Sequence, residues 1–301
     1  MTVARHSDPP AQKCRVFADR LLRFVGRMPL HSALIIICVV WMIPSVGLFV
    51  TSFRPSQDIY SGGWWTAFKH WRFTTQNYVD VLSSGGTVGT MRTNVVNSFI
   101  ITIPATILPV LIASLAAYAF SWIDFRGRDW IFLSVVALMI VPEQMTFVPV
   151  LRLYNRLKLT SSFVGIWIAH TAYALPLAVF LLRNFFVSLP RDLIDSARID
   201  GASEFVIAWR IVMPLSIPAI ASYTIFQFLW VWNDLLMALV YLQHPRLQPL
   251  TVGISSLLTF HAPEWDLLSA AAFLAMVVPL IVFFGLQRYF VRGLVAGSVK
   301  T

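Results

Sequence analysis

The sequence has 301 residues, of which 57% are hydrophobic and only 12% are charged, and its mean hydropathy is +0.72. Soluble domains carry about 25% charged residues, so this composition excludes an ordinary soluble protein and indicates a chain that crosses a membrane several times. The formal charge of +9 would suit nucleic acid, but the basic residues flank the apolar segments, as in a membrane protein. The two cysteines, Cys14 and Cys38, provide neither a disulfide framework nor a metal site.

The chain begins with a basic tail over residues 1–32, and a first apolar span follows over residues 33–52. The tail is longer than the basic start of a signal peptide, and the apolar run approaches the ~20 residues that a bilayer requires. We therefore expect a cytoplasmic tail and an uncleaved membrane anchor. The next loop, to about residue 94, contains Trp64, Trp65 and Trp71, which either lie at the outer headgroup layer or pack within a folded loop.

Five further apolar segments predict an all-α integral membrane protein with six spans. They cover residues 98–122, 130–151, 164–182, 217–241 and 267–284. Small residues in the second span, such as Ala113 and Ala117, would let neighbouring helices approach closely. Most of the 23 Lys and Arg residues lie in segments that are cytoplasmic if both termini are inside, so the positive-inside rule predicts an N-in, C-in topology.

A polar segment over residues 189–218 separates the fourth and fifth spans, and its pattern predicts a helix, a turn and a second helix. Pro190 and Asp192 suit the start of the first helix, and Gly201 suits a left-handed residue just after its end. Ser203 can cap the second helix. The expected apolar faces comprise Leu193, Ile194 and Ala197 on the first helix and Phe205, Ala208 and Val212 on the second.

This polar segment resembles the cytoplasmic loop of the permease subunits of binding-protein-dependent ABC importers. The family pattern has three blocks, Glu-Ala-Ala, Asp-Gly-Ala and Ile-x-x-Pro, and the chain departs from it only in the first block, where charge and small size are kept. The matching residues are Asp195, Ser196, Ala197, Asp200, Gly201, Ala202, Ile211 and Pro214. Residues 231–258 and 288–300, with the stretch from Asn97, resemble the maltose-type sugar uptake branch and extend the likeness over roughly residues 90–300.

The resemblance implies the type I ABC importer permease fold in the inner membrane. The first helix and outer loop would occupy residues 33–89, the permease core 90–288 and a cytoplasmic tail 289–301. The implied partners are a second homologous permease, two ATP-binding subunits, an extracytoplasmic sugar-binding protein, membrane lipid and a mono- or oligosaccharide substrate, without nucleic acid. The polar loop would dock on an ATP-binding subunit and move as a lever.

We expect no enzyme activity, metal or cofactor in the chain itself. A phosphate-binding P-loop needs a lysine directly after a glycine, and none of the lysines follows a glycine. ATP and Mg²⁺ would therefore be bound by the partner ATPase subunits. A non-sugar solute such as a polyamine, an ion-coupled carrier and a membrane enzyme are the alternative functions.

Polar residues inside the predicted spans are candidates for the substrate path, because charge within a bilayer is costly and usually functional. These candidates are Glu143, Gln144, Trp230, Trp232, Asn233 and Asp234. For Glu143, a structural hydrogen bond beside Pro142 is favoured over sugar binding; for Asn233 and Asp234 the two roles are weighted equally. His170 is expected to be a packed histidine whose hydrogen bonds are satisfied.

Overall fold

The computed structural model describes residues 10–83, 85–86, 89–260 and 264–296. Within these ranges the fold is helical, apart from a small antiparallel hairpin formed by β1 (Gly85–Gly86) and β2 (Gly89–Thr90). Four helices are long and apolar enough to cross a membrane, and two sharply bent helix pairs raise the number of candidate spans to six. The predicted all-α membrane fold is therefore confirmed, and the predicted six spans equal the upper count.

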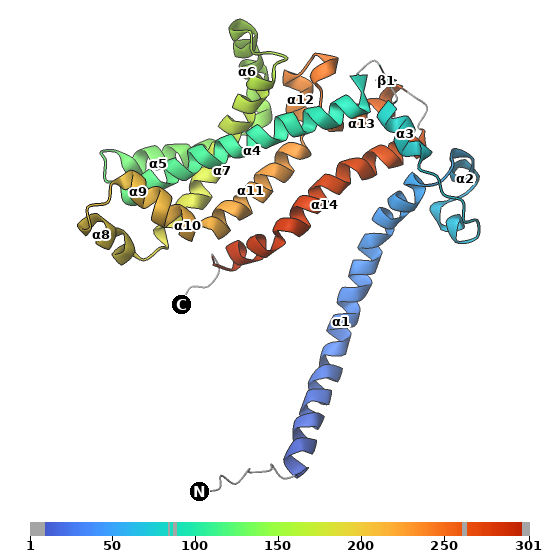
Figure 1. Ribbon diagram of the computed structural model, residues 1–301, viewed down its shortest axis with the longest axis horizontal. Helices are drawn as coiled ribbons and strands as arrows, with labels where there is room; N and C mark the ends of the chain where they lie inside the picture. Colours follow the sequence, from blue (N-terminus) through green and yellow to red (C-terminus); the bar gives the residue numbers. More distant parts are fainter. Residues whose placement is uncertain (1–9, 84, 87–88, 261–263, 297–301) are drawn as a thin grey trace.

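The elements follow one another along the chain as drawn in Figure 1. The first part of the chain comprises α1 (Pro10–Ser52), α2 (Ser56–Ser61), the 3-10 helix η1 (Trp64–Phe68) and α3 (Gln76–Ser83). The middle part comprises α4 (Met91–Trp122), α5 (Arg128–Ala137), η2 (Leu138–Ile140), α6 (Glu143–Leu157) and α7 (Phe163–Val187). The polar loop contains α8 (Arg191–Ile199), α9 (Glu204–Ile207), the π-helical turn η3 (Ala208–Val212) and α10 (Met213–Leu215). The last part comprises α11 (Ile217–Trp232), α12 (Leu236–Tyr241), η4 (Pro245–Leu247), α13 (Leu250–Phe260) and α14 (Trp265–Ala296).

Helix α1 is longer than predicted and stands apart from the other helices for most of its length (Figure 1). It begins at Pro10, so much of the segment predicted as a tail is helical. The apolar part, Met28–Ser52, is almost unburied within the chain. Large apolar side chains on it, such as Trp41 and Ile35, are exposed and therefore face lipid or a partner subunit.

The third predicted span is broken rather than continuous. Helices α5 and α6 are bent by 101° at the break, which η2, Val141 and Pro142 form. Val141 is extended, with ψ at 117°, as expected for a residue whose helical conformation clashes with a following proline ring. The prediction of one span over residues 130–151 did not include this break, although Pro142, Glu143 and Gln144 mark its place in the sequence.

The fifth predicted span, over residues 217–241, is also interrupted. Helix α11 ends at Trp232 and α12 begins at Leu236, and the three residues between them are not helical. The predicted outer loop after it contains a helix that the sequence analysis missed, α13, which packs against α4 and α14. His261, which follows α13 in the sequence, lies outside the described residues.

Helices α4 and α7 form the main packed pair of the molecule. Ala105, Ala113 and Ala117 of α4 and Ala178 of α7 are completely buried. Small side chains allow helix backbones to approach closely in a membrane, where packing rather than hydrophobic burial drives association. The predicted role of the small residues in the second span is therefore confirmed.

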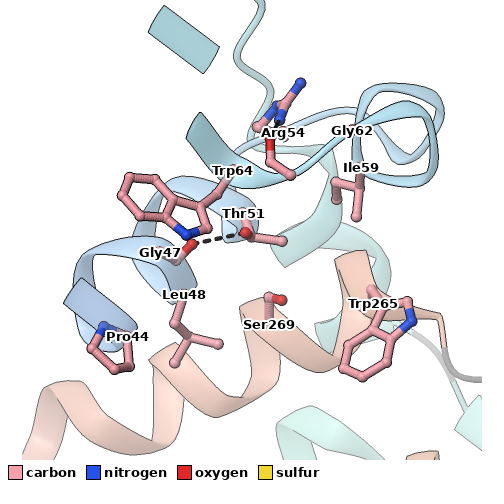
Figure 2. Close-up of a pocket in the computed structure, with 11 residues that line it drawn as sticks. Pro44, Gly47, Leu48, Thr51, Arg54, Ile59, Gly62, Trp64, Trp265 and Ser269 are labelled. Atoms are coloured by element: carbon pink, nitrogen blue, oxygen red, sulfur yellow. Dashed lines mark hydrogen bonds between the residues drawn. The ribbon is translucent and has the colours of Figure 1, made fainter. Parts of the chain in front are cut away.

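The outer loop folds back on the end of α1, and the tryptophans in it have different environments. The ring of Trp64 lies over Gly47, where a Cβ atom would come within 2.8 Å of the indole Nε1, so the contact requires glycine. Figure 2 shows this contact at a cavity of about 500 Å³ that Trp265 and Ser269 of α14 also line. Trp64 is packed within the loop, whereas Trp65 and Trp71 are exposed.

Candidate functional site

The polar loop contains the helix–turn–helix that the sequence predicts. Pro190 occupies the N-cap position of α8, and Gly201, which follows the C-cap residue Asp200, has φ at 81°, in the left-handed region. The Gly201 amide donates to the Arg198 carbonyl and the Ala202 amide donates to the Ala197 carbonyl, each at 3.0 Å. These two bonds satisfy carbonyls that a helix C-terminus leaves free. The glycine turn is therefore confirmed.

The second helix of the loop begins at the predicted residue, and two of the three residues predicted on its inner face, Ala208 and Val212, are buried. The Ser203 hydroxyl accepts a hydrogen bond from the Val206 amide, as an N-cap does. Phe205, predicted on the apolar inner face, is 69% exposed, and Ile207 instead is completely buried. The π-helical turn η3 follows α9 directly and contributes Ala208 and Val212 to the buried side.

The motif residues of the loop differ in their accessibility. Asp195, Ser196, Asp200 and Gly201 are exposed, as is Pro214 at the return to the membrane. The remaining three are buried or half-buried: Ala197, Ala202 and Ile211. Large apolar side chains of the loop are exposed beside them, among them Leu193, Ile199, Phe205 and Trp209. Exposed apolar groups within a charged surface are typical of a protein-binding site.

A hydrogen-bonded cluster joins the loop to the end of α4. Arg198 Nη2 donates to the Trp122 carbonyl at 2.7 Å, and Arg198 Nε donates to Glu204 Oε1 at 2.9 Å. The Tyr118 hydroxyl donates to the other oxygen of the Glu204 carboxylate at 2.5 Å. The bond to Glu204 outweighs partial burial and raises the pKa of the Arg198 guanidinium, which therefore keeps its charge. Sequence analysis missed Tyr118 and Glu204, because nothing local connects two residues so far apart along the chain.

The second part of the candidate site is a cavity of about 560 Å³ at the break between α5 and α6. The start of α6 supplies Glu143, Gln144 and Thr146, α7 supplies Tyr173, and α11 supplies Trp230. The hydroxyl groups of Thr146 and Tyr173 are hydrogen-bonded to each other at 2.6 Å. Apolar side chains form most of the remaining wall, so a few polar groups and an indole ring are presented within an apolar cavity, as in small-molecule sites.

Glu143 occupies a different position from the one expected for it. The sequence analysis placed it deep within a continuous third span, but it is the first residue of α6 and follows the break at Pro142. An acidic side chain at this position interacts favourably with the positive end of the helix dipole. The carboxyl group is half-buried and lines the cavity together with Gln144. The structure thus brings Glu143, Gln144 and Trp230 to one cavity.

The other three path candidates lie outside the lining of this cavity. Trp232 is 3% exposed, and its indole nitrogen donates to the Ala275 carbonyl at 3.0 Å. Asn233 donates to the Leu229 carbonyl of its own helix at 2.8 Å. The Asp234 carboxylate accepts bonds from the first turn of α12, at the amides of Met237 and Ala238. These contacts are structural in kind, and Asp234 acts as a helix cap.

His170 lies next to the cavity in the packed core. The side chain is 2% exposed, which agrees with the predicted packing role, and it lines a cavity of about 50 Å³ that shares Tyr173 and Trp230 with the larger one. Its Nε2 atom has no hydrogen-bond partner among the described residues and lies 3.9 Å from an oxygen of Asp234. The expectation that its hydrogen bonds are satisfied was therefore wrong.

Comparisons with known proteins relate both parts of the site to one family. A family model of binding-protein-dependent transport system inner membrane components matches residues 109–295. The osmoprotective compounds uptake permease protein GgtD of Synechocystis sp. is 51% identical over 94% of this chain and 95% of its own length. The alpha-glucoside transport system permease protein AglG of Rhizobium meliloti is 48% identical over 76% of this chain and 61% of its own length.

A solved structure shows the same fold. It is a chain of a bacterial ABC transporter involved in the import of the acidic polysaccharide alginate, with a TM-score of 0.72 and 22% sequence identity. The match covers 96% of this chain and 100% of that chain. The broken spans and the polar loop of the present chain therefore belong to an architecture that is already known from an importer.

Proposed function

The chain belongs to the family of binding-protein-dependent transport system inner membrane components, and we propose that it forms one half of the pathway through which an ABC importer takes up a sugar. It is a multi-pass membrane protein and a transport component. Membership of this family disfavours an ion-coupled carrier and a membrane enzyme. The name of the relative AglG, an alpha-glucoside permease, supports a glycoside as the solute.

The cavity at the α5–α6 break is the observation that carries the proposal of a sugar substrate. The indole ring of Trp230 offers an apolar face to a sugar ring, whose C–H groups are apolar. Glu143, Gln144 and the hydroxyls of Thr146 and Tyr173 offer acceptors and donors to sugar hydroxyl groups. The volume of about 560 Å³ is within the range of small-molecule pockets.

A cationic solute such as a polyamine fits this cavity less well than a neutral one. Glu143 is the only carboxylate in the described lining, whereas a polyamine carries several separated positive charges that each need a counter-charge or hydration. A neutral hydroxyl-bearing osmolyte would use the same groups as a sugar. The name of the relative GgtD, which takes up osmoprotective compounds, makes such solutes the second class to test.

The polar loop supports the coupling of this pathway to ATP hydrolysis on separate subunits. The exposed apolar residues Leu193, Ile199 and Phe205 provide a surface that an ATP-binding subunit would cover. Closure of two such subunits around ATP would displace α8, and the permease would then open toward the extracytoplasmic binding protein. ATP and Mg²⁺ would remain on the partners, and this chain would supply no ligand to them.

The proposal is tested by the ATPase activity of the assembled complex in nanodiscs. The chain is co-expressed with its neighbouring permease and ATPase, and the binding protein is added with sugars, neutral osmolytes and polyamines. We expect stimulation by one sugar class, with a higher half-stimulating concentration for Trp230→Ala than for Trp130→Ala, an exposed control outside the cavity. Stimulation by polyamines alone, or equal effects of the two variants, would contradict the proposed substrate site.

A further inference from the structure

We infer that Tyr118, Arg198 and Glu204 form a latch that fixes the polar loop to the cytoplasmic end of α4, so that the loop and the helix move as one body. The inference rests on the proposed function, because it concerns how displacement of the loop reaches the pathway. None of the three residues lines the cavity at the α5–α6 break. They are positioning residues, and they act through the elements that they join.

The latch connects three elements through charged and buried groups. Arg198 comes from the last turn of α8, Glu204 is the first residue of α9, and Tyr118 lies in the last turns of α4. Each oxygen of the Glu204 carboxylate accepts one bond, from Arg198 Nε at 2.9 Å and from the Tyr118 hydroxyl at 2.5 Å. Because the single carboxylate serves both donors, neither helix of the loop can move away from α4 without breaking a charge-assisted bond.

The environment of each group favours the bonded arrangement. Tyr118 is only 4% exposed, and a buried hydroxyl that loses its partner is destabilising. Trp122 is the last residue of α4, and its carbonyl belongs to the set that a helix leaves unpaired and partly negative. The Arg198 guanidinium binds this carbonyl at 2.7 Å. An isolated surface ion pair contributes little to stability. Here, however, the guanidinium that pairs with Glu204 also donates to a carbonyl at the end of α4.

A second arginine strengthens the attachment of α4 to its neighbours at this end. Arg183 of α7 lies over the Phe132 ring of α5, with its guanidinium carbon 4.1 Å from the ring centroid, and donates to the Phe120 carbonyl of α4. A guanidinium above an aromatic ring is a favourable cation–π geometry. Because α7 supplies Tyr173 to the cavity wall, a displacement that reaches α4 and α7 also reaches the cavity.

The outer end of α4 is bonded to the far side of the molecule. Asn97 donates to the carbonyls of Arg246 and Gln248 at 2.8 and 3.0 Å, and the Ser98 hydroxyl accepts a bond from the Leu250 amide at 2.8 Å. Asn97 and Ser98 are buried. Helix α4 therefore extends from the polar loop to the segment before α13 with polar bonds at both ends (Figure 1), and it can transmit a displacement between them.

The test uses the complete complex and a variant that removes one oxygen atom. Tyr118→Phe keeps the ring and the packing but removes the bond to Glu204. We expect the ATPase rate to stay within about twofold of the wild type and the sugar transported per ATP to fall about tenfold, as loss of one hydrogen bond to a charged group allows. Glu204→Gln weakens the bonds from both Tyr118 and Arg198, so it should reduce coupling at least as much as Tyr118→Phe. The double variant should be no worse than Glu204→Gln, because Tyr118→Phe removes only a bond that Glu204 accepts.

Arg126→Gln is the matched control, since Arg126 is an exposed cytoplasmic arginine just beyond the end of α4 and outside the cluster. It should retain wild-type coupling. Proportional loss of ATPase and transport in Tyr118→Phe, or an unchanged transport-to-ATP ratio, would overturn the latch. Arg198→Lys should restore part of the coupling that Arg198→Gln loses, because a lysine keeps the charge but cannot bind two acceptors in the fixed geometry of a guanidinium.

A distance measurement separates failure of the latch from failure of the proposed substrate. Spin labels at Asp124, just after α4, and at Asp192 on α8 would report the separation of the two elements with and without nucleotide, in a background that lacks both cysteines. We expect an unchanged, narrow distance distribution in the wild type and a broadened or shifted one in Tyr118→Phe. Because this readout needs no sugar, equal distributions in the two proteins would overturn the latch even if the substrate were not a sugar.

Discussion

The polar loop and the cavity are built by different means. The loop is determined by local rules: Pro190 begins its first helix, Gly201 ends it, and Ser203 caps the second. The cavity exists only because the chain breaks at Pro142 and α7 and α11 pack nearby, which brings Glu143 and Trp230 together. A local change should therefore alter the loop alone, whereas a change in packing should alter the cavity.

The largest effect is expected where the loop depends on packing as well as on its own turn. Ile207→Ala should lower the free energy of unfolding by about 2–5 kcal/mol, because truncation of a completely buried isoleucine leaves a cavity. Phe205→Ala, two residues earlier and exposed, should leave the melting temperature of the detergent-solubilised complex unchanged and reduce retention of the ATP-binding subunits. Equal melting temperatures for the two variants would show that the inner face of α9 is misassigned.

The next largest effect concerns the turn itself. Gly201→Val should lower the free energy of unfolding by about 1–3 kcal/mol and abolish most sugar uptake, because a β-branched residue resists the positive φ of 81°. No atom lies within 4 Å of a Cβ built at this position, so backbone conformation rather than space is limiting. Gly201→Asn is the control, since asparagine tolerates the left-handed region. If thermal stability fell equally in both variants, the conformational argument would fail.

The sequence predicts features that depend on local rules better than features that depend on packing. The turn at Gly201 and the cap at Ser203 were predicted correctly because each depends on neighbours within a few residues. The position of Phe205 was not, because its apolar side chain did not reveal that Ile207, Ala208 and Val212 form the buried side. The break at Val141 has a local cause in Pro142, which the sequence analysis did not interpret as a break. The cluster of Tyr118 with Glu204 depends on tertiary packing, which a single charged residue does not reveal.

An intermediate effect is expected in the cavity. Glu143→Gln should raise the KM for sugar uptake about tenfold with little change in melting temperature, if the carboxylate accepts hydrogen bonds from the substrate. Asp124→Asn, which changes an exposed carboxylate outside the cavity, should leave the KM unaltered. Uptake kinetics in proteoliposomes would measure both. A large loss of thermal stability in Glu143→Gln would instead support the structural role that the sequence analysis favoured.

The smallest effect is expected for the candidate that the structure places away from the cavity. Asp234→Ala should lower stability by about 1 kcal/mol, because it removes the cap of α12. Asp234→Asn should retain most of that stability, since asparagine is also a good cap. Both variants should leave the KM for uptake unchanged. A higher KM with unaltered melting temperature in either variant would indicate that Asp234 contacts the substrate.

The most direct test of the account is the accessibility of the cavity during transport. Gln144→Cys, in a background without Cys14 and Cys38, would be treated with a membrane-impermeant thiol reagent in the nucleotide-bound complex. We predict that the transported sugar slows this labelling, whereas labelling of Gln57→Cys in the outer loop is the same with and without sugar. Labelling of Gln144→Cys that does not respond to any transported solute would contradict the assignment of this cavity to the pathway.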